Sequence, residues 1–221
     1  MKTKLLFVIL FSAVAVCQAQ FETGKKVIGG QIGLSFSKND QNSSPGVDQR
    51  SSMFSSTLLL SRFKSPTLLK GFGFNYAHNY YHANIGNLTN DQVNRTNMMS
   101  VFVNSTKLQP VARKFYLSFT GSLGGSYTFG KSTFSNNTYT RTNGYGIFLS
   151  GGMGLLYQFN QRFLLSCQLV NLLNVSYGYG HFTTYNGANV NKSNISHIDL
   201  STGLNGFSLN SILVGVRYIL K

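Results

Sequence analysis

Hydrophobic and small polar residues alternate without interruption along residues 115–129. The apolar face runs from Phe115 to Phe129, and the other face consists mostly of Ser, Thr and Gly. A period of two over this length is about twice that of a common globular strand and suits a tilted transmembrane β-strand. Residues 145–159 repeat the pattern, with Phe148 and Leu156 as apolar exceptions on the small face. The two segments predict a hairpin with lipid outside and a barrel interior inside.

Similar alternation predicts six further strands, at residues 26–37, 51–63, 68–78, 96–108, 163–177 and from about 207 to the end of the chain. The phase is ambiguous in 51–63 and 96–108. In the strand at 163–177 the apolar residues are expected to face outward, with Asn171 as one polar member. The outward residues of the two last strands are Phe163, Leu165, Cys167, Leu169, Leu173, Val175 and Tyr177, then Ile212, Val214, Val216, Tyr218 and Leu220.

The connections between these segments alternate in length. Polar stretches at 38–50, 79–95, 130–143 and about 180–206 are long, whereas those near 64–66, 109–113 and 160–161 are short. Outer-membrane barrels place short turns in the periplasm and long loops outside, and a soluble sandwich has no reason to sort its loops in this way. The expected fold is all-β: an eight-stranded antiparallel up-and-down transmembrane β-barrel, with short periplasmic turns and four long extracellular loops.

The N-terminus carries a secretory signal. Two lysines precede the apolar run 5–16, and Cys17 and Ala19 put small residues at the third-last and last positions before a cleavage site. We predict a cleaved signal peptide over residues 1–19 and one outer-membrane barrel domain over 20–221. The alternative is a lipoprotein signal with Cys17 as the lipidated residue, against which Val16 stands where a small residue is expected. Cleavage leaves Cys167 as a single cysteine, which excludes an intramolecular disulfide.

Composition adds a charge pattern. The net charge of +14 falls to +12 when the two lysines of the signal are removed. The basic residues near the short turns are Lys25, Lys26, Arg62, Lys64, Lys70, Lys107, Arg113, Lys114, Arg162, Arg217 and Lys221. We expect this basic rim to face anionic lipid headgroups, with each contact contributing about 1 kcal/mol. No basic stripe or recognition motif points to nucleic acid, so outer-membrane lipids are the expected partner.

The mature chain resembles the family of small eight-stranded outer-membrane β-barrel proteins of Gram-negative bacteria. The likeness lies in Gly29-Gly30-x-x-Gly33-x-Ser35-Phe36, in Leu69-x-Gly71-x-Gly73-x-x-Tyr76 and in the ending from Gly215 to Leu220. The ending is similar to the assembly signal of such barrels, through Gly215, Val216, Tyr218 and Leu220, although the usual terminal Phe is replaced by Leu220 and Lys221. The resemblance implies the outer membrane as location and the barrel-assembly machinery as a partner during insertion.

The small residues of the inner face raise the question of a lumen. Eight strands leave an interior that side chains can just fill, but Gly and Ser leave it partly open. The predicted lumen lining is Tyr116, Ser118, Ser122, Gly124, Phe148, Ser150, Gly152 and Leu156. We expect Tyr116, Phe148 and Leu156 to plug it, with a water-filled passage as the alternative. The predicted membrane belt is Phe115, Phe159, Phe163 and Tyr218 at the periplasmic side, with Phe129, Tyr145 and Tyr177 at the outer side.

Candidate chemistry is confined to the long-loop side, where all four histidines fall. His197 with Asp199 forms a possible base and orienting acid, and Ser193 or Ser196 the nucleophile of a rim enzyme. Ser and Asn are so abundant that solvated loop histidines explain the same pattern. His78 and His82 suit a metal only if their segment is helical, so no metal site is predicted.

The expected function is that of an integral outer-membrane protein, not an enzyme, with a structural or surface-interaction role for its loops. The alternative is a narrow porin-like channel or a small-ligand carrier, and the third reading is a lipid A-modifying hydrolase or acyltransferase. No cofactor is expected, and the sequence names no specific protein partner.

Overall fold

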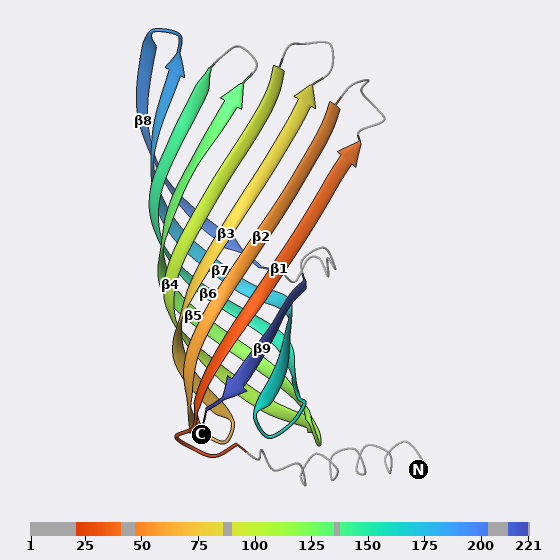
Figure 1. Ribbon diagram of the computed structural model, residues 1–221. Coiled ribbons are helices and arrows are strands. Elements are labelled where there is room, and N and C mark those ends of the chain that lie inside the picture. The colour runs from red at the N-terminus through yellow and green to blue at the C-terminus, as the bar shows by residue number, and fades with distance from the viewer. Residues whose placement is uncertain (1–20, 41–46, 86–89, 135–137, 203–211, 221) are drawn as a thin grey trace, which may run out of the picture.

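The computed structural model describes residues 21–40, 47–85, 90–134, 138–202 and 212–220, and these form strands joined by turns (Figure 1). The predicted signal peptide lies outside the described residues. No helix in the described part is long and apolar enough to cross a membrane. The strands are β1 (Lys26–Asp40), β2 (Val47–Ser65), β3 (Leu68–Ile85), β4 (Asn90–Ala112), β5 (Phe115–Phe134), β6 (Tyr139–Gln158), β7 (Phe163–Asn186), β8 (Asn189–Ser201) and β9 (Ile212–Ile219).

The strands close into a ring in which every neighbouring pair is antiparallel. Strands β1 to β7 pair in sequence order, and β9 lies between β7 and β1. Closure comes from the ladder that pairs Val27 with Ile219 and continues to the pair Leu34 and Ile212. The ring therefore has eight positions, and the predicted fold class, an antiparallel up-and-down barrel, is confirmed.

The eighth position of the ring, beside β7, is shared by β8 in the upper half and β9 in the lower half, which the sequence does not predict. Strand β7 continues to Asn186, the chain reverses at Gly187 and Ala188, and β8 runs back along the upper half of β7. Gly187 has φ of 58°, a left-handed conformation that glycine adopts without strain. Most of the loop predicted over residues 180–206 is thus a hairpin, and its last part, from 203, lies outside the described residues. The Asn186-Gly187 pair is a strong hairpin signal that the reading by periodicity overlooks.

The other long connections are also shorter than predicted, because the strands continue into them. For example, β3 extends to Ile85 and β4 begins at Asn90, within a stretch assigned to loop. Figure 1 shows these pairs rising together as long hairpins at one end of the barrel. Beyond the apolar zone both faces of a strand are polar, so the alternation in hydrophobicity stops although the backbone ladder goes on. The short turns at the other end lie at residues 66–67, 113–114 and 159–162, close to the predicted positions, except that β4 continues through most of the connection predicted at 109–113.

The alternation separates an apolar outside from an inside of small and polar residues. Leu34, Phe72 and Leu123 are about half exposed on the outer wall. Strand β7 departs from the predicted phase, because register shifts interrupt its pairing with β6 between Gly151 and Gly152 and between Met153 and Gly154. These irregularities place Asn171 opposite Gly152 on the inner face. An uninterrupted alternation predicts that Asn171 faces outward, but the bulges turn its side chain inward.

An apolar core fills the barrel at the short-turn end. Its members come from most strands of the ring and from the segment before β1: Phe21, Val27, Phe63, Leu69, Leu108, Tyr116, Leu156, Leu164 and Ile219. Leu108, Leu156 and Leu164 are fully buried, and the hydroxyl of Tyr116 donates to Oε1 of Gln158 at 3.2 Å. We call this set the plug.

Replacement of Leu156 by Ala removes buried methyl groups from the centre of the plug. We expect the free energy of unfolding to fall by about 2–5 kcal/mol, because neighbouring side chains cannot fill the cavity. Denaturant unfolding of the refolded barrel in detergent measures the change. Leu155→Ala, on the outer face next along the chain, is the control and should cost less; an equal loss at both positions would contradict a packed plug.

Candidate functional site

Above the plug the barrel encloses a chamber of about 630 Å³. Its wall includes neighbouring residues of small size, since Ser122 of β5 lies opposite Ser150 of β6. Polar lining residues include Gln31, Thr57, Asn75, Ser100, Asn104, Thr120, Ser126, Gln168, Asn171, Asn174 and Ser176, and apolar ones include Leu59, Met98, Phe102, Phe148 and Leu213. A cavity of this size and mixed lining is typical of small-molecule sites.

The predicted lumen residues divide between the chamber and the plug. Ser122, Phe148, Ser150 and Gly152 line the chamber. Gly124 also faces inward, since a Cβ on it would lie 2.9 Å from the ring of Phe148. The remaining three belong to the lower, buried part of the interior: Tyr116, Ser118 and Leu156. Of the three residues predicted to plug the lumen, Tyr116 and Leu156 are buried in the plug, whereas Phe148 borders the chamber.

The two irregularities in β7 add polar groups to the chamber. Nε2 of Gln168 donates to Oδ1 of Asn171 at 2.5 Å, and both side chains line the cavity. Gly152 makes room for them, since a Cβ at that position would lie 3.0 Å from Nε2 of Gln168. Bulges commonly re-aim a side chain in this way, and the strict alternation assumed from sequence could not reveal it.

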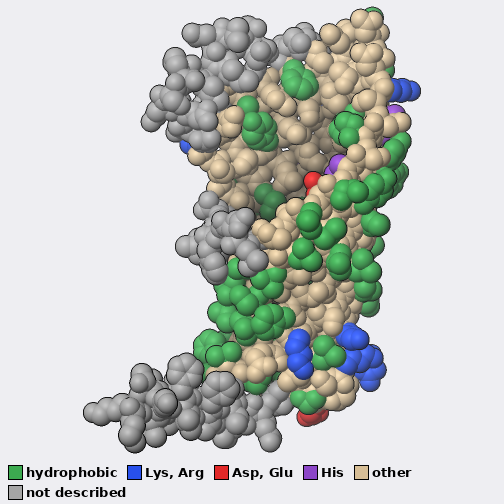
Figure 2. Space-filling view, turned by 180° about the vertical axis from the view of Figure 1, so that it is seen from behind, with side chains coloured by type: hydrophobic (Ala, Val, Ile, Leu, Met, Phe, Trp, Pro, Cys, Tyr) green, Lys and Arg blue, Asp and Glu red, His purple; other side chains and the backbone are tan. Residues whose placement is uncertain are grey.

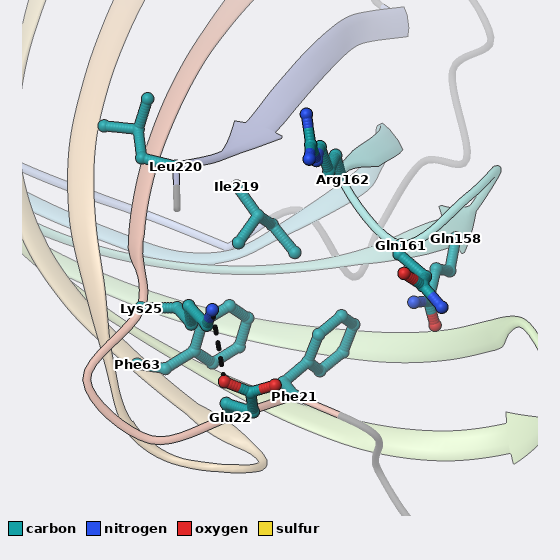
Figure 3. A pocket seen from close by; sticks show the side chains of 9 residues that line it. All are labelled: Phe21, Glu22, Lys25, Phe63, Gln158, Gln161, Arg162, Ile219 and Leu220. Atoms are coloured by element: carbon teal, nitrogen blue, oxygen red, sulfur yellow. Dashed lines mark ion pairs between the residues drawn. The ribbon is translucent and has the colours of Figure 1, made fainter.

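The plug seals the chamber from the short-turn end. The ring of Phe21 stacks on Phe63, with centroids 4.7 Å apart, and contacts Tyr116 at 5.2 Å. Figure 3 shows Phe21 and Phe63 facing each other beside the ion pair of Glu22 with Lys25, whose atoms lie 3.2 Å apart. A separate cavity of about 330 Å³ lies on this outer side of the plug. The chamber is therefore blind at its lower end.

In the part of the chain that the structure describes, the wall above the plug is incomplete. Among the described residues β8 pairs only with β7, whereas the upper part of β1 pairs only with β2. Every residue of β8 is exposed. Seen from behind, the molecule is hollowed above its apolar band, and basic side chains gather at the short-turn end (Figure 2). Among the described residues, none closes the chamber on the side of the long hairpins.

The candidate catalytic residues lie on β8 but do not form one site. Nε2 of His197 lies 3.4 Å from Oδ2 of Asp199, both on the inner face, and His197 borders the chamber. Ser196 pairs with Tyr179 and occupies the opposite face. Ser193 shares the inner face but is four residues from His197, which in a strand is about 13 Å. Neither serine reaches the imidazole in this conformation.

The other histidines lie on the outer face of the hairpins or at its edge. Nδ1 of His78 is 2.9 Å from Oδ1 of Asn97, and Nε2 of His82 is 3.8 Å from Oδ1 of Asp91. His78 and His82 sit four residues apart in a strand, again about 13 Å, which is too far to share a metal ion. In the described part of the chain no group of three or more His, Cys, Asp or Glu side chains is placed to hold a metal.

Arg217 is the residue that sequence reasoning misplaces. It is assigned above to the basic rim, but it faces inward from β9, is only 6% exposed and lines the chamber. Its Cγ lies 2.9 Å from the position of a Cβ on Gly29, so the glycine provides its space. Within the described residues its guanidinium makes no ion pair or hydrogen bond, and Nε is buried without a partner. The outward positions of Val216 and Tyr218 were the signal that Arg217 points inward.

The predicted belt residues lie on the outer wall near the two ends of the apolar zone. At the short-turn end Phe115 packs on Tyr157 and Phe163 on Tyr218, with centroids 4.7 and 5.0 Å apart. Phe159 lies in the turn after β6 and is 61% exposed. Toward the hairpins, Phe129, Tyr145 and Tyr177 lie outward, and Tyr127 packs between the first two. In β9, Val216 is exposed, Gly215 faces inward toward Gln31 and Ser166, and Leu220 follows the strand.

The solved structures that are similar to this chain share little sequence identity with it. No protein-family model and no curated protein matches the chain. Similar solved structures include OprG from Pseudomonas aeruginosa (16% identity, 91% of this chain and 98% of that one, TM-score 0.46). A major outer membrane protein from Thermus thermophilus shares 11% identity over 88% and 99% of the two chains, with a TM-score of 0.47. The outer membrane protease OmpT from Escherichia coli shares 7% over 91% and 97%, with a TM-score of 0.36.

The unpartnered Arg217 predicts an unusual effect on stability. Replacing it by Met keeps most of its volume and removes a buried charge, so we expect the free energy of unfolding to rise by at least about 1 kcal/mol in buffer without organic anions. Denaturant unfolding in detergent measures it. The matched control is Arg162→Met, at an exposed arginine of the short-turn end, which should change little. A loss of stability on Arg217→Met would contradict the absence of an internal partner.

Proposed function

We propose that this chain is an integral outer-membrane protein that binds a small ligand in a blind, outward-opening chamber and does not conduct. The observation that carries the proposal is the division of one interior into two parts. The lower part is a packed apolar plug with fully buried leucines, and the upper part is a chamber of about 630 Å³ with polar and aromatic lining. A structural barrel has no need of such a chamber, because eight strands can be filled completely by side chains.

The outer wall supports the membrane location. Phe115 and Phe129 mark the two belts on β5 and are fourteen residues apart. At roughly 3.3 Å per residue and a tilt of roughly 40°, this corresponds to about 35 Å, which covers an apolar band of about 25 Å and reaches the headgroups on both sides. The exposed basic residues near the short turns suit anionic headgroups there. Signal-directed export and insertion by the barrel-assembly machinery, through the C-terminal strand, are parts of the same proposal.

A second candidate function, surface interaction, is favoured by the hairpins. Tyr139 and Tyr185 stack with centroids 4.6 Å apart, and Lys131 and Arg141 lie over the ring of Tyr139 at 4.5 and 5.9 Å. Aromatic rings held beside cations on rigid strands resemble the composition of binding surfaces. The cluster belongs to β5, β6 and β7 above the belt, and it is separate from the chamber.

Planar-bilayer recording tests whether the plug closes the barrel. We expect purified, refolded protein to give no discrete conductance steps, because fully buried apolar side chains leave no continuous water path through the lower interior. A heat-dependent shift in gel mobility of the same sample verifies that the barrel is folded. Reproducible unitary steps from folded protein would contradict the plug.

Thiol labelling tests whether the chamber opens outward. In a Cys167→Ser background, Ser122→Cys places a thiol in the chamber, and Ser118→Cys places one four residues lower on the same face, where Ser118 is 8% exposed. We expect a membrane-impermeant methanethiosulfonate, added to intact cells, to label the Ser122→Cys protein at least about tenfold faster, since thiolates react only where reagent and water reach them. Equal rates at both positions, or no labelling at the upper one, would refute a blind outward-opening chamber.

A further inference from the structure

One buried cation dominates the charge of the chamber. Arg217 lies between Gly29 of β1 and Leu164 of β7, at the level where the plug gives way to open space. Only 6% of its surface is exposed. Within the described residues no carboxylate lies within 4.0 Å of it and no group accepts a hydrogen bond from it. A cation taken out of water without a partner destabilises the fold, and an anion bound in the adjoining cavity would offset this cost.

The acid on the inner face of β8 does not neutralise this arginine. Asp199 lies beside His197 at 3.4 Å, and the two side chains are 61% and 54% exposed near the open side of the chamber. No other Asp or Glu whose side chain the structure describes faces inward, since Asp91 lies exposed on the outer face and Glu22 lies on the far side of the plug. The floor of the chamber therefore keeps the positive charge of Arg217.

The other residues that line the chamber indicate the chemistry of the rest of the ligand. Asn75 and Asn104 line the chamber, and their buried Oδ1 atoms have no donor among the described residues. Since amide O and N can be interchanged, each side chain offers a hydrogen bond of either kind. Phe102 and Phe148 border the same space, with ring centroids 6.4 Å apart and planes at 60°. Two rings in tilted contact offer an apolar surface on which an aryl or flat apolar group can pack.

We propose that the chamber binds an organic monocarboxylate, with its carboxylate on the guanidinium of Arg217 and its apolar body against Phe102 and Phe148. The planar guanidinium presents paired donors that match a carboxylate in a bidentate geometry. A single positive charge balances a monoanion, whereas a phosphate dianion would leave an uncompensated negative charge among neutral amides and hydroxyls. This inference rests on the proposed ligand-binding function and names the class of ligand.

Isothermal titration of the folded full chain in detergent tests the inference, with benzoate as the probe and benzamide as its neutral isostere. We expect benzoate to bind at least tenfold more tightly than benzamide and than inorganic phosphate. Arg217→Met should weaken benzoate at least tenfold and leave benzamide unchanged, while Arg217→Lys should retain part of the preference. Arg162→Met is the control and should bind as the wild type does. If the Met variant does not fold, the Lys variant and the wild-type ratio of benzoate to benzamide decide.

Two further variants distinguish failure of this inference from failure of the proposed ligand-binding function. Ser122→Phe fills the cavity, whereas Gly121→Phe points outward, where a Cβ meets nothing within 4 Å. One outcome is that benzoate and benzamide bind with equal affinity and that Ser122→Phe, but not Gly121→Phe, abolishes the binding of both. This outcome would overturn the carboxylate site but support the ligand chamber. Phosphate binding as tightly as benzoate would overturn the choice of a monocarboxylate. Binding of neither aryl probe to folded wild-type protein would overturn the inference together with the ligand-binding proposal.

Discussion

The ladder between β1 and β9 is the constraint on which the rest of the structure depends. In a membrane every backbone N–H and C=O must be paired within the protein, so a sheet that crosses lipid has to close on itself. Here closure is made by eight residue pairs, from Val27 with Ile219 to Leu34 with Ile212. Among the described residues β9 begins at Ile212, and the ladder that closes the ring lies in the lower part of the barrel. The described strands of the upper part continue as long hairpins, so the two ends of the barrel differ.

The interior follows from the same division. Where the ring is fully closed, large apolar side chains from opposite strands meet and form the plug around Leu156 and Tyr116. Beside β8, small residues such as Ser122 and Ser150 leave space that no described side chain opposite fills. The chamber therefore results because the small inner residues lie at the same height as the part of the wall where β8 has no second neighbour among the described strands. Arg217 lies at the boundary, with its stem over Gly29 and its charged end bordering the chamber.

Two local features shape the upper barrel without changing the ring. The bulges in β7 turn Asn171 inward and give the chamber polar groups that a regular strand would have turned to the outside. The turn at Gly187 sends β8 back along β7, which leaves a strand edge without a neighbour among the described residues. Edge strands of this kind often carry charged residues that discourage pairing with other chains, and β8 has Lys192 on its outer face.

The sequence by itself determined the class of fold, the two faces of most strands and the short turns. These depend on alternation between neighbouring residues, and lipid on one side of the wall enforces it. It did not determine the lengths of the hairpins, since polar strands above the apolar zone carry no such alternation, nor the bulges, which shift the phase by single residues. The sequence predicts that Tyr116, Leu156 and Phe148 fill the interior, and only the tertiary structure decided that Phe148 instead borders a chamber together with Ser122. It also decided that Arg217 is internal and has no partner for its Nε among the described residues. The physical reason is that an inner side chain packs against strands across the barrel, and local sequence does not state which residues those are.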